Sequence, residues 1–332
     1  MAAPITPIDA AYLTDTMSQF DMVIDVRSPA EFADDHIPGA VNLPVLDNLQ
    51  RVEIGTLYKK VSPFAAKRAG AVLIARNIAM HIDRRLSAMP RDWRPLVYCW
   101  RGGQRSGAMA RIFSDIGWQT SLVDGGYKAY RRHIVRLLET VPSTLRLIVL
   151  AGRTGSAKTR ILKAAEQKDL QIIDLEGIAC HRGSLLGNEP DKPQPSQRLF
   201  ESRLANALIR LDPNRPVFVE AESNKIGQIH IPPTFWARMR SAGRVTLDAP
   251  LAVRVAFLEQ DYAHIKTNHE SLAATLSGLS FRHGHALIAN WEAQIKANEW
   301  TTLVKSLLES HYDPAYDRSA ARRKTLELAR LN

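Results

Sequence analysis

Short apolar runs alternate with segments of helical spacing along the first 140 residues. The runs 21–26 (DMVIDV), 95–99 (PLVYC) and 121–126 (SLVDGG) predict buried strands. RSPAEF at 27–32 and GAMARIFSDIG at 107–117 predict helices that follow the first two. Strands that alternate with helices are typical of a parallel α/β sheet, in which ligands bind beyond the carboxyl ends of the strands.

The alternation begins again after residues 140–144 (TVPST), which have the composition of a linker. Four further strands are predicted, at 145–152 (LRLIVLAG), 170–177 (LQIIDLEG), 216–223 (PVFVEAES) and 244–250 (RVTLDAP). A helix is predicted after the first of them. Beyond residue 250 the spacing is mostly helical. The pattern therefore predicts an α/β domain over 1–139, a second one over 145–250 and a helical extension over 251–332.

The composition indicates a class of binding partner and a cellular compartment. The 332 residues carry 44 Lys and Arg against 34 Asp and Glu, a formal charge of +10, which favours RNA or DNA as a partner or marks an ordinary basic protein. Two cysteines, Cys99 and Cys180, suit an enzyme of a reducing cytoplasm. The N-terminus lacks a signal-peptide pattern, and the longest apolar run is too short to span a bilayer, so we expect a cytoplasmic protein without membrane contact.

The stretch CWRGGQRS at 99–106 is typical of an anion-binding loop with a reactive thiol. A loop that leads from a strand into a helix directs its backbone amides at one centre, and Arg101 and Arg105 add positive charge. A thiol at that centre is expected to be partly deprotonated at neutral pH. We therefore predict Cys99 as the catalytic residue. The predicted anion-binding residues are Arg101, Gly102, Gly103, Gln104, Arg105 and Ser106.

A second glycine-rich stretch, GRTGSAKT at 152–159, lies between a predicted strand and a predicted helix, as a phosphate-binding P-loop requires. Lys158 would neutralise a terminal phosphate and Thr159 could hold Mg²⁺. Ala157 stands where the pattern has glycine, which costs about 1–2 kcal/mol if the position needs positive φ. The predicted diphosphate-binding residues are Gly152, Thr154, Gly155, Ser156, Lys158 and Thr159. The alternative is a loop kept only for structure.

Two further groups are weaker candidates in the second domain. Glu220 or Glu222, at the end of a strand, could orient a water bound to Mg²⁺, or both could be surface charges. His181 and Arg182 could hold an anion. No metal site is predicted, because no cysteine or carboxylate stands at a useful spacing from the His283 and His285 pair.

Several blocks of the chain resemble known families. IDVRSPAEFADDHIPGAVNLP at 24–44, with the cysteine loop, resembles the rhodanese family over roughly residues 8–135; there Asp25 and Arg27 follow the first strand, with His36 and Gly39 in the next turn. The order of CWRGGQRS, DGGYKAYR, DLEGIACHRGSLLG, EAESNKIGQIHIP and YDPAY resembles the tRNA 2-selenouridine synthase family over nearly the whole chain. Ala157 is the main departure.

The second resemblance implies a fold, a reaction and substrates. It implies a rhodanese-like domain, a P-loop NTPase-like α/β domain and a helical C-terminal extension. The family replaces the sulfur of wobble 2-thiouridine in tRNA with selenium from selenophosphate, through an S-geranyl intermediate formed from geranyl diphosphate. It implies no tightly bound cofactor and a partner that supplies selenophosphate. The Cys99 thiolate would carry selenium as a selenosulfide or attack the phosphate-bearing species.

The basic surface would then bind tRNA phosphates. The predicted contacts are Lys59, Lys60, Arg84, Arg85, Lys128, Arg131 and Arg132. Trp100 is a candidate for stacking on a splayed base. Two other functions fit the same loops: a thiosulfate sulfurtransferase fused to a small kinase, and a nucleotide-gated binding module without chemistry.

Overall fold

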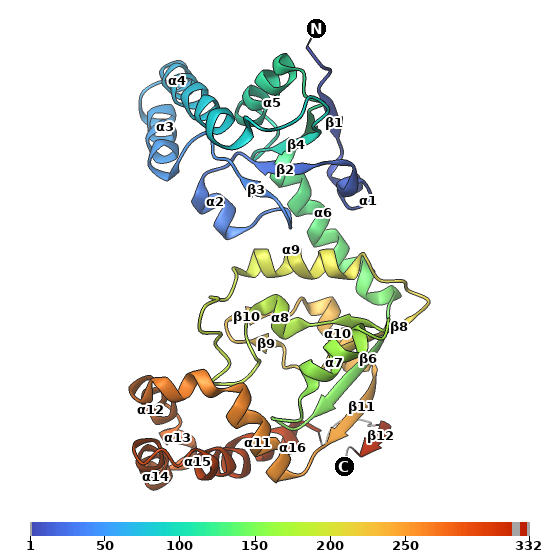
Figure 1. Cartoon of the computed structure of the whole chain (residues 1–332), viewed down its shortest axis with the longest axis vertical. Helices are drawn as coiled ribbons and strands as arrows, with labels where there is room; N and C mark the ends of the chain where they lie inside the picture. The colour runs from blue at the N-terminus through green and yellow to red at the C-terminus, as the bar shows by residue number, and fades with distance from the viewer. Residues whose placement is uncertain (1, 321–325, 331–332) are drawn as a thin grey trace. The chain divides into compact units, whose positions relative to one another are not determined.

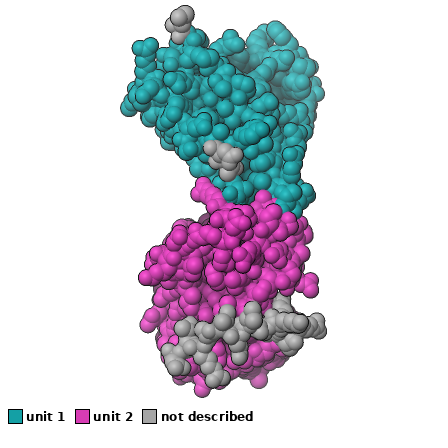
Figure 2. Space-filling view, turned by 90° about the vertical axis from the view of Figure 1, so that its right-hand side faces the viewer, with its two compact units in different colours: residues 1–140, 195–209 teal, residues 141–194, 210–332 magenta. Residues whose placement is uncertain are grey.

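The computed structural model describes residues 2–320 and 326–330. Two compact units make up the chain: unit 1 contains residues 1–140 and 195–209, and unit 2 contains residues 141–194 and 210–332 (Figure 2). The first boundary falls at the segment predicted as a linker. The predicted second domain, however, is interrupted, because residues 195–209 belong to unit 1.

Unit 1 is built on a parallel sheet of five strands in the order β1-β5-β4-β2-β3 (Figure 1). The strands are β1 (Thr6–Ile8), β2 (Met22–Asp25), β3 (Val41–Asn42), β4 (Pro95–Tyr98) and β5 (Ser121–Val123). All four residues of β4 are buried, as expected for a central strand that is covered on both faces. The three predicted strands are confirmed; the edge strands β1 and β3 were not predicted, because they are short and largely exposed and so show no apolar run.

The helices of unit 1 are α1 (Leu13–Thr16), α2 (Pro29–Asp34), α3 (Asn48–Lys60), α4 (Pro63–His81), α5 (Gln104–Ile116), α6 (Gly126–Thr140) and α9 (Gln197–Leu208). They pack on this sheet or on one another, as α9 does on α6 and α3 on α4. The core joins Ile24 and Val97 of the sheet to Met109 and Phe113 of α5. This packing fixes α5 behind β4, so the turn between them, which contains the cysteine loop, is held at both ends.

Helix α9 joins unit 1 through ion pairs that span a long stretch of sequence. Arg198 of α9 lies 2.8 Å from the Asp34 carboxylate, and Arg131 of α6 is paired with Glu201 of α9. These ion pairs join residues 70 and 164 positions apart, so they leave no local pattern in the sequence. For that reason the sequence did not show that α9 belongs to unit 1.

Unit 2 contains a second parallel sheet, in the order β12-β11-β6-β8-β7 (Figure 1). Its strands are β6 (Arg146–Gly152), β7 (Gln171–Ile173), β8 (Pro216–Glu220), β11 (Gly243–Asp248) and β12 (Leu326–Arg330), and β9 (Lys225–Ile226) and β10 (Ile229–His230) form a separate hairpin. The helices near this sheet are α7 (Lys158–Glu166), α8 (Leu175–Ala179) and α10 (Pro233–Ser241). The four predicted strands are confirmed, and the sheet has the α/β architecture of a P-loop domain.

The rest of unit 2 is helical, with its own apolar core. The helices are α11 (Leu251–Asp261), α12 (His269–Ser277), α13 (Ser280–His283), α14 (His285–Lys296), α15 (Trp300–Leu307) and α16 (Asp313–Ala320). Leu276, Trp291, Ile295 and Leu303 are central in that core. The predicted extension 251–332 is thus helical up to Ala320, but β12 corrects its end, because this strand pairs with β11; residues 321–325 and 331–332 lie outside the described part.

Six short turns complete the part of the chain that the structure describes. The 3₁₀ turns are η1 (Ala10–Tyr12), η2 (Met17–Gln19), η4 (Val141–Thr144) and η5 (Ala263–Thr267), and the π turns are η3 (Ile82–Leu86) and η6 (Leu308–Tyr312). Over residues 2–320 and 326–330 no helix combines the length and the apolar character needed to cross a membrane.

Candidate active sites

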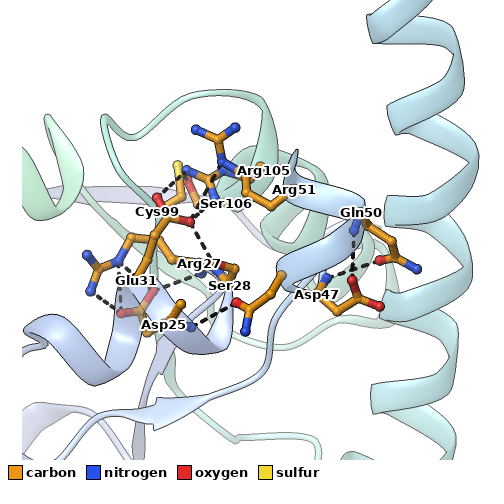
Figure 3. Close-up of polar contacts among 12 residues, drawn as sticks. Asp25, Arg27, Ser28, Glu31, Asp47, Gln50, Arg51, Cys99, Arg105 and Ser106 are labelled. Atoms are coloured by element: carbon orange, nitrogen blue, oxygen red, sulfur yellow. Dashed lines mark hydrogen bonds and ion pairs between the residues drawn. The ribbon is translucent and has the colours of Figure 1, made fainter. Parts of the chain in front are cut away.

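The cysteine loop connects the carboxyl end of β4 to the start of α5, as predicted (Figure 3). Cys99 is 3% exposed, and Ser106 beside it is fully buried. Arg101, Gly103 and Gln104 are exposed at the rim of the loop. The loop therefore holds its sulfur at its buried end, while its outer residues face solvent.

The surroundings of Cys99 favour its thiolate. The Ser106 hydroxyl donates a hydrogen bond to Sγ at 3.1 Å. Burial alone would raise the pKa of the thiol, but hydrogen bonds from the Ser106 hydroxyl and from the Ser106 and Arg101 amides, with the charge of Arg105, outweigh it. The net pKa lies below the ordinary value for cysteine, as is usual for reactive thiols at a helix N-terminus.

Arg105 is held by a carboxylate that the sequence analysis did not single out. Its Nη1 lies 2.8 Å from Oε2 of Glu31, and Arg51 Nε lies 3.9 Å from the same oxygen (Figure 3). Glu31 in turn accepts a hydrogen bond from the Ser28 amide, in the capping box of α2. The signal was present as the SPAE pattern at the start of α2, but its partner stands 74 residues away.

A second turn, after β5, supports the back of the cysteine loop. The amides of Tyr127 and Lys128 donate to the carbonyls of Cys99 and Trp100 at 2.8 and 3.0 Å. Gly126 has a φ of +58°, and a Cβ there would lie 2.4 Å from the Cys99 carbonyl oxygen. The DGG sequence of this turn is therefore needed to let two backbones approach closely.

We expect Gly126→Ala to displace the loop amides from the thiol and so raise the Cys99 pKa. At pH 7 alkylation of Cys99 by iodoacetamide, followed by peptide mass spectrometry, should slow about tenfold, the effect of about one pKa unit. Ser106→Ala removes one hydrogen-bond donor to the thiolate. It should also raise the pH midpoint, which is the pH at which alkylation of Cys99 reaches half of its maximal rate. Gly107→Ala is the control, because a Cβ there meets no atom within 4 Å. An unchanged midpoint in both test variants would show that the loop does not tune the thiol.

The residues that continue the rhodanese pattern lie beneath the loop rather than at it. Arg27 and Asp25 form a buried ion pair of 2.6 Å, and the Arg27 guanidinium lies 4.0 Å from the centroid of the Tyr127 ring. His36 is bonded to the Phe32 carbonyl at 2.8 Å. These side chains stabilise the fold around the loop, and none of them presents a free charge to a ligand.

The P-loop of unit 2 connects β6 to α7, as predicted. Gly152 and Gly155 have φ of 158° and 85°, and a Cβ on Gly155 would lie 3.0 Å from the Arg254 backbone. Ala157 has φ 56° and ψ 29°, the left-handed conformation. The position thus does require positive φ, and alanine carries its cost of about 1–2 kcal/mol. Lys158 Nζ donates to the Gly152 carbonyl at 3.0 Å, so its charge lies over the loop.

Three glutamates gather beside the P-loop, and one of them was not predicted. The Thr159 hydroxyl donates to Glu176 at 2.7 Å, and the Glu176 amide donates to Glu220 at 2.8 Å. Glu176 and Glu222 are hydrogen-bonded to each other. Glu176 follows β7 in the sequence DLEG, so its position at a strand end was a usable signal.

Burial favours the protonated forms of the glutamates in this acidic cluster. Burial first, and then the charge of Asp174, raise the pKa of Glu220 to about 8. Burial also raises the pKa of Glu222 well above its ordinary value and raises that of Glu176. Glu220 is fully buried, and its Oε2 has no hydrogen-bond partner among the described residues. A cation bound at this cluster would therefore stabilise the charged carboxylates.

The oxygen donors beside the P-loop fit Mg²⁺ only if phosphate and water complete the coordination shell. In the described part of the chain, no three acidic, His or Cys side chains are arranged to enclose a metal ion. Mg²⁺ usually takes one or two carboxylates together with phosphate oxygens and water. The Thr159 hydroxyl and the carboxylates of Glu176 and Glu222 would hold the ion next to a bound phosphate, where it would supply positive charge.

A large cavity brings most of the predicted phosphate-binding residues together. It measures about 1000 Å³, and the predicted residues on its wall are Gly152, Thr154, Gly155, Lys158, Thr159, His181, Arg182 and Glu222. Ser156 is buried below the loop, and Glu220 lies behind Glu176 rather than on the wall. Glu176 and Cys180 also line the cavity.

The HRGS turn is less available than the sequence indicated. Arg182 is held by Glu189 at 2.8 Å and by Asp261 at 2.7 Å, so its charge is already paired. Burial lowers the pKa of His181, which keeps the ring neutral at pH 7, and its Nδ1 accepts from the Gly183 amide at 3.1 Å. The pair lines the cavity, but it does not form the cationic anion site that we expected.

Six of the seven basic residues predicted to contact tRNA are exposed: Lys59, Lys60, Arg84, Arg85, Lys128 and Arg132. Arg131 is different, because it is paired with Glu201 and lies 3.9 Å from the buried Asp35. Trp100 is 36% exposed, with its ring 5.2 Å from that of Tyr127. Six of the predicted residues are therefore accessible to a polyanion, whereas Arg131 holds α9 against α6.

Fold and sites together define a class of protein: a rhodanese-like domain with a cysteine of lowered pKa in its loop, joined in one chain to a P-loop domain with a helical extension. Residues 9–133 match the model of the rhodanese-like domain, and residues 145–330 match that of the tRNA 2-selenouridine synthase AAA domain. The chain belongs to the tRNA 2-selenouridine synthase family.

Individual relatives agree with the family models. The tRNA 2-selenouridine synthase of Alcanivorax borkumensis is 34% identical over 91% of this chain and 90% of its own length. That of Nitrosomonas europaea is 35% identical over 78% of this chain and 66% of its own length, and that of Bdellovibrio bacteriovorus is 37% identical over 76% and 67%. The match thus spans about two thirds of the length of some relatives and nearly all of another.

Proposed function

We propose that the protein converts 2-thiouridine at the wobble position of tRNA to 2-selenouridine, with geranyl diphosphate and selenophosphate as substrates. The single observation that carries this proposal is the pair of anion sites on one chain: a low-pKa thiol in an anion-binding loop and a P-loop beside an acidic cluster. Membership of the family supports the tRNA substrate. The reaction would take place in the cytoplasm, where tRNA is modified and a partner enzyme supplies selenophosphate.

The first step is an alkylation in unit 2. The sulfur of 2-thiouridine attacks C1 of geranyl diphosphate, the S–C1 bond forms, the C1–O bond breaks, and diphosphate leaves with the bonding electrons. The N3 proton of the base passes to solvent. Negative charge grows on the leaving diphosphate, where the loop amides and the Lys158 ammonium can stabilise it. Alkylation turns a poor leaving group, the thiocarbonyl sulfur, into a thiolate that departs easily.

The second step uses the anion loop of unit 1. The Cys99 thiolate attacks phosphorus of selenophosphate, the P–Se bond breaks, and selenide leaves with the bonding electrons. Selenide adds to C2 of the S-geranyl base, the C2–S bond breaks, and geranyl thiolate departs; N3 takes up a proton, and water hydrolyses the phosphocysteine. A selenosulfide on Cys99 would need a two-electron oxidation of selenium, and neither substrate is an oxidant. Attack at phosphorus is therefore the role we assign to Cys99.

The test of the proposed function is nucleoside mass spectrometry of tRNA carrying 2-thiouridine. Geranyl diphosphate alone should produce S-geranyl-2-thiouridine, and addition of selenophosphate should convert it to 2-selenouridine. Thiocyanate formation from thiosulfate and cyanide at a comparable rate, without change in the tRNA, would favour the sulfurtransferase instead. Tight ATP binding with neither product would favour the binding module.

Binding of tRNA is expected to depend steeply on salt. The affinity should fall with a log–log slope of about −0.7 to −0.9 for each phosphate contact. Reversing Arg84 and Arg85 to Glu should weaken binding and flatten that slope, as measured by filter binding between low and physiological salt. Arg91→Glu with Arg111→Glu is the matched control, because both residues are exposed in unit 1 but lie outside the predicted contacts. Equal losses in both pairs would mean that only net charge matters.

A further inference from the structure

A narrow apolar cavity adjoins the P-loop cavity in unit 2. It measures about 70 Å³, and its walls come largely from the helical part of the chain, including Leu258 of α11, Leu272 of α12, and Leu303, Val304 and Leu307 of α15. Leu272, Leu303 and Leu307 also belong to the apolar core of the helical region. Of the residues that line the cavity, the charged ones are Glu259 and Lys266. This cavity is not used by any step derived above.

The two cavities share part of their walls. Thr154, Ser184, Leu258, Tyr262 and Tyr312 line both of them. Thr154 is a residue of the P-loop itself, so the apolar cavity begins where the phosphate-binding loop ends. A ligand with an anionic head on the loop and an apolar tail would meet both surfaces at once.

The shared wall is held by fixed contacts. The Tyr262 hydroxyl lies 3.2 Å from Oγ of Ser184, and the Arg182 guanidinium lies 4.8 Å from the centroid of the Tyr262 ring. Arg182 is itself held by its ion pairs with Asp261 and Glu189. Burial raises the pKa of Tyr262 to about 12, so its hydroxyl stays neutral. Tyr262 therefore presents a fixed, uncharged aromatic surface to a ligand that lies across the wall shared by the two cavities.

We propose that this cavity receives the apolar chain of the prenyl diphosphate and limits the length of chain that the protein accepts. The assignment rests on the proposed function, because it supplies the tail site for the same donor. The cavity is about half the size of the roughly 150 Å³ cavity that admits benzene. It suits a slender chain: the first isoprene unit lies at the junction of Tyr262 and Tyr312, the second enters the cavity, and a third finds no room.

The test changes the size of the cavity at Val304, which is only partly buried. Calorimetric titration of the full chain compares inorganic pyrophosphate with dimethylallyl, geranyl and farnesyl diphosphates. The parent should bind geranyl diphosphate about 30-fold or more tighter than pyrophosphate, since apolar contact adds affinity to the same head group. Val304→Trp should reduce that advantage to about threefold or less and leave pyrophosphate binding unchanged. Val304→Ala should raise the affinity for farnesyl diphosphate about fivefold.

Thr302→Trp is the matched control, because it places the same side chain on the exposed side of α15. It should behave as the parent does. If Val304→Trp fails to fold, as judged by its circular dichroism, the Val304→Ala result decides. A parent that forms S-geranyl-2-thiouridine, combined with Val304 variants of unchanged chain preference, overturns the cavity assignment alone. A parent that forms no S-geranyl product overturns the proposed function instead.

Discussion

Lys158→Ala is expected to slow geranyl transfer to tRNA by about 100-fold or more, which corresponds to about 2.7 kcal/mol of activation free energy. Its ammonium lies over the P-loop, 3.0 Å from the Gly152 carbonyl, and is the mobile charge that can follow the departing diphosphate. The rate of S-geranyl-2-thiouridine formation under saturating substrate measures the effect. Selenium exchange on tRNA that already carries the geranyl group should change much less.

Two further variants make this prediction specific. Lys168→Ala removes an exposed lysine just after α7 and should transfer geranyl at the parent rate. Ala157→Gly relieves the left-handed alanine at φ 56° and should leave the rate unchanged or higher. Geranyl transfer by Lys158→Ala at the parent rate would mean that the loop is only structural and that the diphosphate binds elsewhere.

Cys99→Ala is expected to abolish 2-selenouridine while S-geranyl-2-thiouridine accumulates. The thiol is held by the Ser106 hydroxyl in the loop of unit 1, whereas the proposed diphosphate site is the P-loop of unit 2. The loss should exceed about 1000-fold, because the loop contains no second thiol to attack phosphorus. Nucleoside mass spectrometry after incubation with both donors reports the two products separately.

Geranyl transfer is the internal control for the fold of this variant. If Cys99→Ala keeps the parent rate of geranyl transfer, the missing selenium product reflects chemistry and not unfolding. Loss of both products from a variant with parental thermal stability would contradict the division of work between the two loops. Retention of 2-selenouridine would show that selenium reaches the base without the thiol.

Much of the fold could be predicted because the strands that build it are apolar and bounded by recognisable turns. The runs at 21–26, 95–99 and 145–152 became β2, β4 and β6. What the pattern missed depends on pairing between distant residues. Strand β12 is defined by its register with β11, and α9 joins unit 1 through Arg198 and Asp34, 164 positions apart.

The candidate sites were predictable in their loops but not in their charges. Cys99, its glycines and the P-loop lysine follow from short contiguous motifs. Sequence reasoning could not show that Arg182 is neutralised by Asp261, 79 positions later, or that Arg105 is bound to Glu31. It also missed Glu176, whose importance comes from the Thr159 hydroxyl and Glu222 beside it.

The sequence by itself determined the two α/β sheets, the two anion loops and the position of the alanine, Ala157, that stands where the P-loop pattern has glycine. These features are local, since they depend on the spacing of apolar residues and on the backbone freedom of glycine within a few positions. Tertiary structure alone decided which charges are available and which are paired, how far burial raises the carboxyl pKa values, and that an apolar cavity adjoins the P-loop. Those properties depend on desolvation and on contacts between residues that only folding brings together.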